Sequence, residues 1–226
     1  MKIYEIEDPT TLDMNPTNST KVMFEKFNLT HNDEQSKVAI KIANSLELNH
    51  SVIVLGEASA GKTSLVNIAI EITSEKTPYK KSYLNISSYD QIQLLGDCDS
   101  QGIISKILSD SDEPHLFHID GDFPVWVSLP MSMLVDENEF INGSGRKDVP
   151  KHQTKFILEA ETLNDVCPSF VARSVIICVE SSKDELSKLI LQSRLKNYGK
   201  QEKKMLYKMY LTFEEAQLVK EEAFVD

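Results

Sequence analysis

The fold is decided by one stretch, Gly56-Glu57-Ala58-Ser59-Ala60-Gly61-Lys62-Thr63. This stretch fits the pattern G-x-x-x-x-G-K-[ST], in which backbone N–H groups surround nucleotide phosphates. The apolar run 51–55 before it predicts a buried strand. After it, Leu65, Ile68 and Ala69 have the spacing of one helix face. A glycine-rich loop between a strand and a helix is the context in which this motif binds phosphate.

Each residue type in the loop has a chemical reason to be there. Gly56 and Gly61 allow backbone conformations that let several N–H groups converge on an anion, and the helix N-terminus adds partial positive charge. Lys62 brings a full charge to the β- and γ-phosphates, and the Thr63 hydroxyl is suited to ligate Mg²⁺. We therefore expect ATP or ADP, with Mg²⁺, to be held by Gly56, Glu57, Ala58, Ser59, Ala60, Gly61, Lys62, Thr63 and Ser64.

Composition limits the possible partners. The 226 residues include 24 Lys and Arg against 35 Asp and Glu, a net charge of −11. Such a charge repels a polyanion, which argues against nucleic-acid binding. No apolar run approaches the roughly 20 residues that cross a bilayer, so no membrane contact is expected. The three cysteines have no metal-ligand spacing, and we expect a cytoplasmic, reduced protein.

The order of elements predicts the domain organisation. Residues 1–30 are polar and interrupted by prolines, which suggests an extended leader. Further strands are expected at 82–86, 115–119, 155–158 and 175–179, with helices between most of them. This alternation is typical of an α/β protein with a mainly parallel five-stranded sheet flanked by helices. We expect this domain over 31–182 and a small helical region over 183–226.

The residues after the third strand bear on metal binding and hydrolysis. Asp120 ends that strand, where a carboxylate can hold Mg²⁺ through water; alternatively it is a turn residue in Asp-Gly. Many ring-forming ATPases continue with a glutamate that orients the attacking water, but this chain has Gly121. Asp122 could substitute as the base. However, successive side chains of an extended segment point to opposite sides, which would direct Asp122 away from the position that a side chain at 121 would take. We expect slow hydrolysis or none.

From Asp120 onward the sequence resembles the second AAA+ module of dynein heavy chains, over about residues 32 to 182. The similar segments are Asp120-Gly121-Asp122-Phe123-Pro124-Val125-Trp126-Val127, Asp136-Glu137-Asn138, Asn142-Gly143, Leu158-Glu159-Ala160-Glu161-Thr162-Leu163 and Cys167-Pro168-Ser169-Phe170-Val171-Ala172-Arg173-Ser174. That module also has glycine at the position of Gly121. Pro130 departs from the family pattern and should kink the helix expected after Trp126.

The resemblance implies a P-loop AAA+ fold, in which the terminal helices form a lid, and roles for individual residues. Glu159 would be the polar sensor facing the γ-phosphate; the alternative is a surface carboxylate at the end of a strand. Arg173 would be an arginine finger that acts in the nucleotide site of the neighbouring module; the alternative is a surface arginine. Trp126 would lie at a module interface or in the core.

The resemblance also implies a function. The chain would hold ATP as a structural or regulatory ligand within a ring of AAA+ modules of one motor. It would meet a microtubule only through the whole motor, in the cytoplasm and associated with the cytoskeleton. Two alternatives stay open: a self-sufficient P-loop ATPase or kinase, and a vestigial scaffold module without nucleotide. His115 and His118 should face opposite sides of their strand, which makes them a poor metal pair.

Overall fold

The computed structural model describes residues 19–27, 29, 33–109, 113–121, 123–164, 166–179 and 202. The chain divides into two compact units, Met1–Ser181 and Ser182–Asp226. Apart from Glu202, the helical region expected over 183–226 lies outside the described residues. No helix in the described part of the chain is long and apolar enough to cross a membrane.

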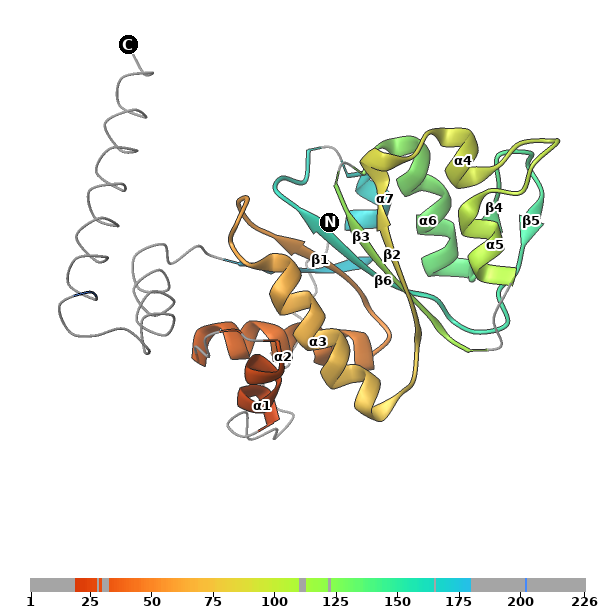
Figure 1. Ribbon diagram of the computed structural model, residues 1–226. Helices are drawn as coiled ribbons and strands as arrows, with labels where there is room; N and C mark the ends of the chain where they lie inside the picture. Colours follow the sequence, from red (N-terminus) through yellow and green to blue (C-terminus); the bar gives the residue numbers. More distant parts are fainter. Residues whose placement is uncertain are drawn as a thin grey trace, which may run out of the picture. The chain divides into compact units, whose positions relative to one another are not determined.

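A five-stranded sheet forms the centre of the first unit (Figure 1). Its strands are β1 (Ser51–Leu55), β2 (Lys80–Asn85), β3 (His115–Asp120), β6 (Lys155–Ala160) and β7 (Ser174–Cys178). They lie in the order β2-β3-β6-β1-β7, and every neighbouring pair is parallel. The predicted α/β fold with a parallel five-stranded sheet is therefore confirmed, and each predicted strand falls within two residues of the observed one.

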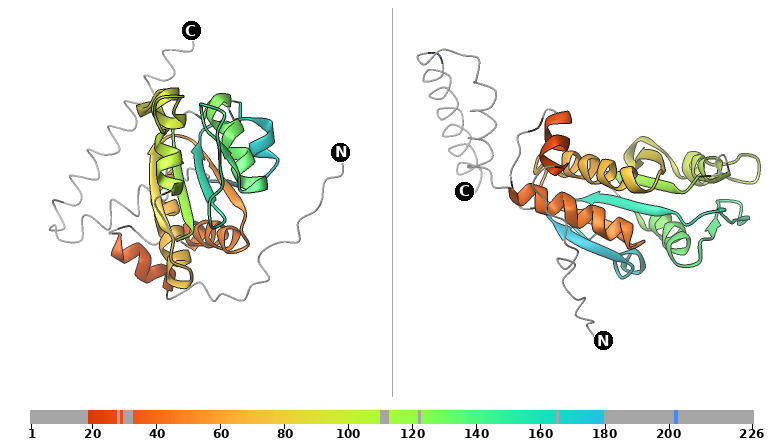
Figure 2. Two further views of the ribbon diagram at one scale, coloured as in Figure 1. Left: turned by 90° about the vertical axis from the view of Figure 1, so that its right-hand side faces the viewer. Right: turned by 90° about the horizontal axis from the view of Figure 1, so that it is seen from below.

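Two groups of helices cover the sheet. The first is α1 (Ser19–Lys26), α2 (Asp33–Glu47) and α3 (Lys62–Lys76), and the second is α4 (Gln91–Leu95), α5 (Ile103–Ser109), α6 (Val125–Glu137) and α7 (Pro168–Val171). In Figure 1, α1 and α2 lie well apart from α4 and α6, and the right-hand view of Figure 2 shows helices above and below the sheet.

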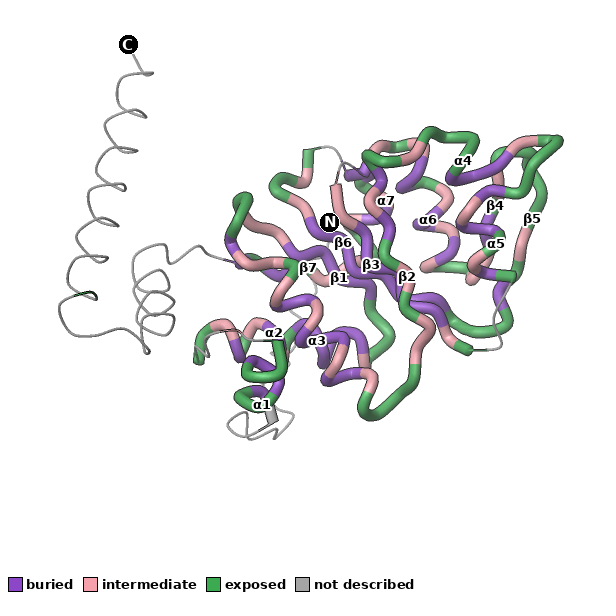
Figure 3. The backbone as a smooth tube through the Cα atoms, viewed as in Figure 1, coloured by how far each residue is buried: buried purple, intermediate pink, exposed green. Residues whose placement is uncertain are grey.

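Strand alternation explains the two apolar cores. Val52 and Val54 pack with the first group of helices, whereas Ile53 between them packs with the second. Successive side chains of a strand point to opposite faces, so a strand covered on both sides must be apolar at every position. The central strands are accordingly buried along most of their length (Figure 3).

A small antiparallel hairpin joins α6 to β6. It consists of β4 (Phe140–Ile141) and β5 (Lys147–Asp148). The Gly143 N–H donates to the Leu95 carbonyl at 3.0 Å, and a Cβ on Gly143 would lie 1.9 Å from the Gly96 carbonyl oxygen. The hairpin turn therefore rests directly on the backbone at the end of α4, which only glycine permits.

The extended leader expected over residues 1–30 is wrong for 19–26, which form α1. Met23 and Phe24 are buried in the core that α1 shares with α3. Burial of these two side chains stabilises α1 although the neighbouring residues are polar. The sequence pattern of residues 1–30 shows only that polar character. Pro130 lies inside α6, as expected from the sequence.

Candidate nucleotide site

The loop between β1 and α3 has the backbone of a phosphate cradle. Ser59 and Gly61 have φ angles of 65° and 85°, in the left-handed region that favours glycine. No side chain caps the first turn of α3 within the described residues, so its N–H groups remain available to an anion. Lys62 folds back over the loop, where its Nζ donates to the carbonyls of Gly56 and Glu57, both at 2.8 Å.

Glu159 of β6 lies beside this loop in a buried position. Its Oε2 accepts a hydrogen bond from Thr63 Oγ1 at 2.7 Å, and its Oε1 lies 2.6 Å from His118 Nε2. The Glu159 side chain is only 2% exposed, so the alternative of a surface carboxylate is wrong. A buried carboxylate needs partners for both oxygens, which the hydroxyl and the imidazole provide.

Asp120 at the end of β3 is held by two other groups. Its Oδ1 accepts from the Gly121 backbone N–H at 2.9 Å, which closes the Asp-Gly turn. Its Oδ2 accepts from the Tyr83 hydroxyl at 2.8 Å. This hydrogen bond from the phenol to the carboxylate is the main cause that raises the pKa of Tyr83 to about 12. Asp120 therefore has the turn role and also lines the cavity described next.

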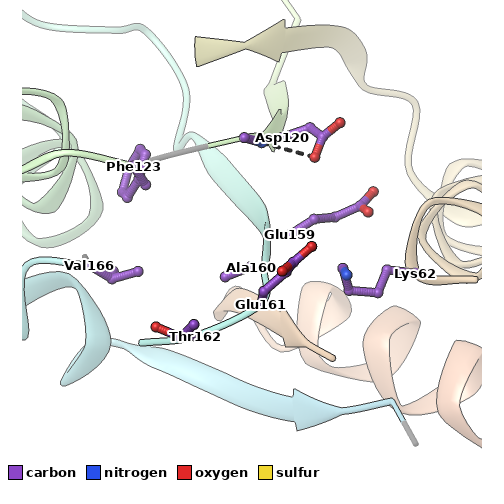
Figure 4. A pocket seen from close by; sticks show the side chains of 9 residues that line it. Lys62, Asp120, Phe123, Glu159, Ala160, Glu161, Thr162 and Val166 are labelled. Atoms are coloured by element: carbon purple, nitrogen blue, oxygen red, sulfur yellow. Dashed lines mark hydrogen bonds between the residues drawn. The ribbon is translucent and has the colours of Figure 1, made fainter. Parts of the chain in front are cut away.

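These side chains border one cavity of about 290 Å³ (Figure 4). It is lined by Lys62, Asp120, Gly121, Phe123, Glu159, Ala160, Glu161, Thr162 and Val166. The structure thus brings Lys62, Asp120 and Glu159 together from three different elements. Their common location follows from the parallel sheet, because the carboxyl ends of β1, β3 and β6 meet at one edge.

The donor set of the cavity suits a Mg²⁺–nucleotide pair. One lysine faces three carboxylates, those of Asp120, Glu159 and Glu161. A divalent cation would offset that negative charge, and Mg²⁺ is usually held by one or two carboxylates together with waters and substrate phosphates. The described residues contain no cluster of three or more His, Cys, Asp or Glu that would hold a metal alone. Such a site fits an ion that arrives with its nucleotide.

Gly121 has a backbone that disfavours any side chain. Its φ is +91°, and a Cβ there would lie 2.8 Å from Ser87 Oγ. The water-orienting glutamate that many ring-forming ATPases carry here is absent, and the turn itself disfavours any side chain at this position. Asp122, the alternative base, lies outside the described residues.

Arg173 lies at the opposite edge of the sheet, directly before β7. The length of that strand, roughly 16 Å for five residues, separates it from the phosphate loop. Its Nη1 donates to the Ser169 carbonyl at 2.6 Å, and its guanidinium pairs with Asp136. Both members of this pair are more than a third exposed. Arg173 is thus a surface side chain remote from the cavity of its own chain.

Three aromatic positions complete the comparison with the sequence. Trp126 is half-buried and packs against the core under α4 to α7. His115 stacks on Phe117, whereas His118 contacts Glu159 on the other face, so the two histidines are apart as expected. Sequence reasoning assigned no role to Tyr83 and no further role to His118. Alternation would have placed His118 on the face of Asp120, but the position of Tyr83 depends on its pairing with His118 across β2 and β3.

No protein-family model matches the chain. Distant sequence similarity is found to dynein heavy chains. Cytoplasmic dynein 2 heavy chain 1 of Caenorhabditis elegans is 27% identical over 175 residues, 72% of this chain and 4% of that protein. Its human counterpart is 25% identical over 78% of this chain and 4% of that protein. Dynein axonemal heavy chain 5 of Rattus norvegicus is 24% identical over 76% of this chain and 5% of that protein.

The fold has a counterpart among solved structures. NtrX from Brucella abortus, crystallised in complex with ADP, superposes with a TM-score of 0.54 at 15% identity. The match covers 77% of this chain and 44% of that one. The chain itself spans only 4–5% of the length of the dynein heavy chains compared above. It is thus an α/β protein with an AAA+-like fold and a distant sequence similarity to dynein heavy chains.

Proposed function

We propose that this chain is an AAA+ module of a dynein-like motor that binds ATP or ADP with Mg²⁺ and hydrolyses ATP slowly or not at all. The observation that carries the proposal is the convergence of Lys62, Thr63, Asp120 and Glu159 at the carboxyl edge of the parallel sheet. A cationic side chain, open helix N–H groups and carboxylates of this arrangement suit a metal-bound polyphosphate.

Each group has a separate part in binding. Lys62 exchanges its hydrogen bonds to Gly56 and Glu57 for the phosphates, together with backbone N–H groups of residues 56–64. Thr63, Asp120 and Glu159 present hydroxyl and carboxylate oxygens, the ligand type that Mg²⁺ prefers. Glu159 also borders the cavity where the sequence predicts a sensor for the γ-phosphate. The nucleotide, when bound, supplies the phosphoanhydride bond, and Mg²⁺ neutralises its charge.

Slow hydrolysis is expected because position 121, directly after Asp120, carries no carboxylate. Within the described residues, no carboxylate follows Asp120 on its strand, because Gly121 occupies that place in a left-handed turn. Without a glutamate at position 121 to orient water, stabilisation of charge alone gives limited acceleration. Bound ATP would then act as a ligand that fixes the conformation of the module.

Arg173 is proposed to act outside its own chain. It is exposed and remote from its own cavity, which suits a finger directed at a neighbouring AAA+ module in the same ring. A guanidinium in that role stabilises transition-state charge by about 10³ to 10⁵ in rate. The distant similarity to dynein heavy chains supports the ring arrangement. In such a motor the chain would be cytoplasmic and cytoskeleton-associated, and would reach microtubules only through the whole motor.

Nucleotide-dependent thermal unfolding tests the binding part of the proposal. At a nucleotide concentration of 100 Kd, mass action stabilises the protein by about 2.7 kcal/mol, which raises Tm by about 5–11 °C at this chain length. The Lys62→Ala variant should lose most of this shift while its nucleotide-free Tm stays close to wild type, since the partners of Lys62 among the described residues are two loop carbonyls. A wild-type protein that MgATP and MgADP do not stabilise would favour the vestigial scaffold. Multiple-turnover hydrolysis by the isolated chain would favour an independent ATPase.

A further inference from the structure

Strand β3 buries a histidine, His118, among apolar residues. Its neighbours Phe117 and Ile119 are fully buried, and His118 itself is 5% exposed. Burial of an imidazole costs free energy unless its nitrogens find hydrogen-bond partners, a cost that an apolar side chain at the same position would not carry. His118 therefore calls for a role that an apolar side chain could not fill.

The register of the sheet brings His118 to Glu159. On β6, Ile157 lies opposite His118, and Glu159 follows two residues later on the same face. Such diagonal neighbours are within reach of long side chains. His118 Nε2 lies 2.6 Å from Glu159 Oε1. An ionised carboxylate only accepts hydrogen bonds, so Nε2 carries the proton of this contact.

The other oxygen of Glu159 reaches the phosphate loop. Its Oε2 accepts from Thr63 Oγ1 at 2.7 Å. A hydroxyl has one proton and two lone pairs, so a threonine that donates to a carboxylate can still turn its lone pairs to a cation. His118 thus orients Glu159, and Glu159 in turn orients the Thr63 hydroxyl at the start of α3.

The His118 ring is restrained from its other side by Tyr83. The two rings meet edge-on, with centroids 5.1 Å apart and an angle of 80°. Tyr83 is on β2 and Glu159 is on β6, the two strands that flank β3 in the sheet. The imidazole therefore lies between a ring on one neighbouring strand and a carboxylate on the other, which limits its rotation.

We propose that His118 is a positioning residue of the nucleotide site, which holds Glu159 so that the Thr63 hydroxyl presents its lone pairs to Mg²⁺. His118 does not line the cavity and acts through Glu159. Asp120 keeps the part in Mg²⁺ binding proposed above. The inference rests on the proposed binding of a Mg²⁺–nucleotide. Outer partners of metal ligands typically contribute about 10- to 100-fold to metal affinity.

Three variants separate positioning from a merely structural role. His118→Phe removes the N–H donor, whereas His118→Gln keeps a side-chain N–H that can replace it. His115→Phe is the matched control, because it removes the other histidine of β3, which is also buried and stacks on Phe117. The measurement is the Kd for ADP with Mg²⁺ and with EDTA, and the ratio of the two gives the gain in affinity from Mg²⁺.

The proposal predicts a loss that is specific to the metal. His118→Phe should reduce the Mg²⁺ gain by about 10-fold or more. Its Kd in EDTA should stay near the wild-type value, because Lys62 and the loop N–H groups hold the phosphates without Glu159. His118→Gln should restore most of the gain, and His115→Phe should keep it. An unchanged gain in His118→Phe, or an equal loss in all three variants, would overturn the inference.

A measurement on the wild-type protein does not depend on how His118→Phe folds. In ¹⁵N–¹H spectra of the histidine rings, the signal that disappears in His118→Gln identifies His118. Adding Mg²⁺ to the ADP complex should shift this signal and leave that of His115 in place. A His118 signal that does not respond to Mg²⁺ would contradict the link through Glu159 to Thr63. Wild-type protein that binds no ADP in Mg²⁺ or EDTA would instead refute the proposed function, and this inference with it.

Discussion

Placing alanine or glutamate at position 121 tests why this site should hydrolyse ATP poorly. Gly121 has a φ of +91°, and its virtual Cβ lies 2.8 Å from Ser87 Oγ and 3.4 Å from Asn85 Oδ1. Neither Ser87 nor Asn85 lines the cavity. A side chain at 121 would therefore begin in a strained backbone and point toward the end of β2, away from the space that Lys62 and Glu159 border.

The size of the effect can be estimated from these two contacts. A left-handed backbone costs a residue with a Cβ about 1–2 kcal/mol. At about 2–4 °C per kcal/mol for a chain of this size, Gly121→Ala should lower Tm by about 2–8 °C. Gly145 provides a matched control, because its φ is +78° and nothing lies within 4 Å of its virtual Cβ. Gly145→Ala should show the loss of Tm from backbone strain alone. If Gly121→Ala loses more Tm than Gly145→Ala, adding Ser87→Ala to the Gly121→Ala protein should restore the difference.

The assay combines thermal unfolding with steady-state ATP turnover. Gly121→Glu should be less stable than wild type and should not raise turnover, because its carboxylate starts on the wrong side of the turn. The reasoning would be refuted by a Gly121→Ala protein as stable as wild type. It would equally be refuted by a Gly121→Glu protein whose turnover rises tenfold or more.

Three further predictions follow from contacts around the site. The hydrogen bond to Asp120 raises the pKa of Tyr83 from its usual value of 10.0 to about 12. The contribution of this hydrogen bond to the free energy of unfolding is therefore complete below pH 10 and is lost as pH rises through 12. Spectroscopic titration should show one tyrosine ionising late, and Tyr83→Phe should remove it; a Tyr83 that titrates near pH 10 would contradict the contact. Gly143→Ala should lower the free energy of unfolding in urea by about 1–3 kcal/mol, since its methyl group would meet the Gly96 carbonyl oxygen at 1.9 Å. An unchanged urea midpoint would show that the hairpin does not pack on the end of α4. A double-mutant cycle on Arg173 and its partner Asp136 should give about 0.2–1 kcal/mol that weakens with salt, whereas coupling well above that range would make Arg173 a structural anchor and not a free finger.

Local patterns in the sequence predicted the frame of this molecule. The apolar run that forms β1 is continuous because this strand is covered by helices on both faces, and a sequence shows such burial directly. The loop 56–63 was predicted from residue types whose backbone requirements are local. The placement of Asp120 and Glu159 near Lys62 also followed, because parallel strands bring their carboxyl ends together.

Contacts that depend on register or on packing could not be predicted in this way. Tyr83 meets Asp120 only because β2 pairs with β3 so that Tyr83 lies opposite His118. The close approach of Gly143 to Gly96 joins segments whose proximity depends on how α4 packs beneath the hairpin. Helix α1 was missed because Met23 and Phe24 become informative only once α3 is present to cover them.

The most direct test of the central claim is to identify the nucleotide that the protein retains. The purified chain would be incubated with MgATP for hours, separated from free nucleotide, denatured and analysed for its bound ligand. Retained ATP, in about one equivalent and absent from Lys62→Ala, is the predicted result. Retained ADP would show that an effective base is present, with Asp122 the first residue to replace. The absence of any bound nucleotide in repeated preparations would contradict the account.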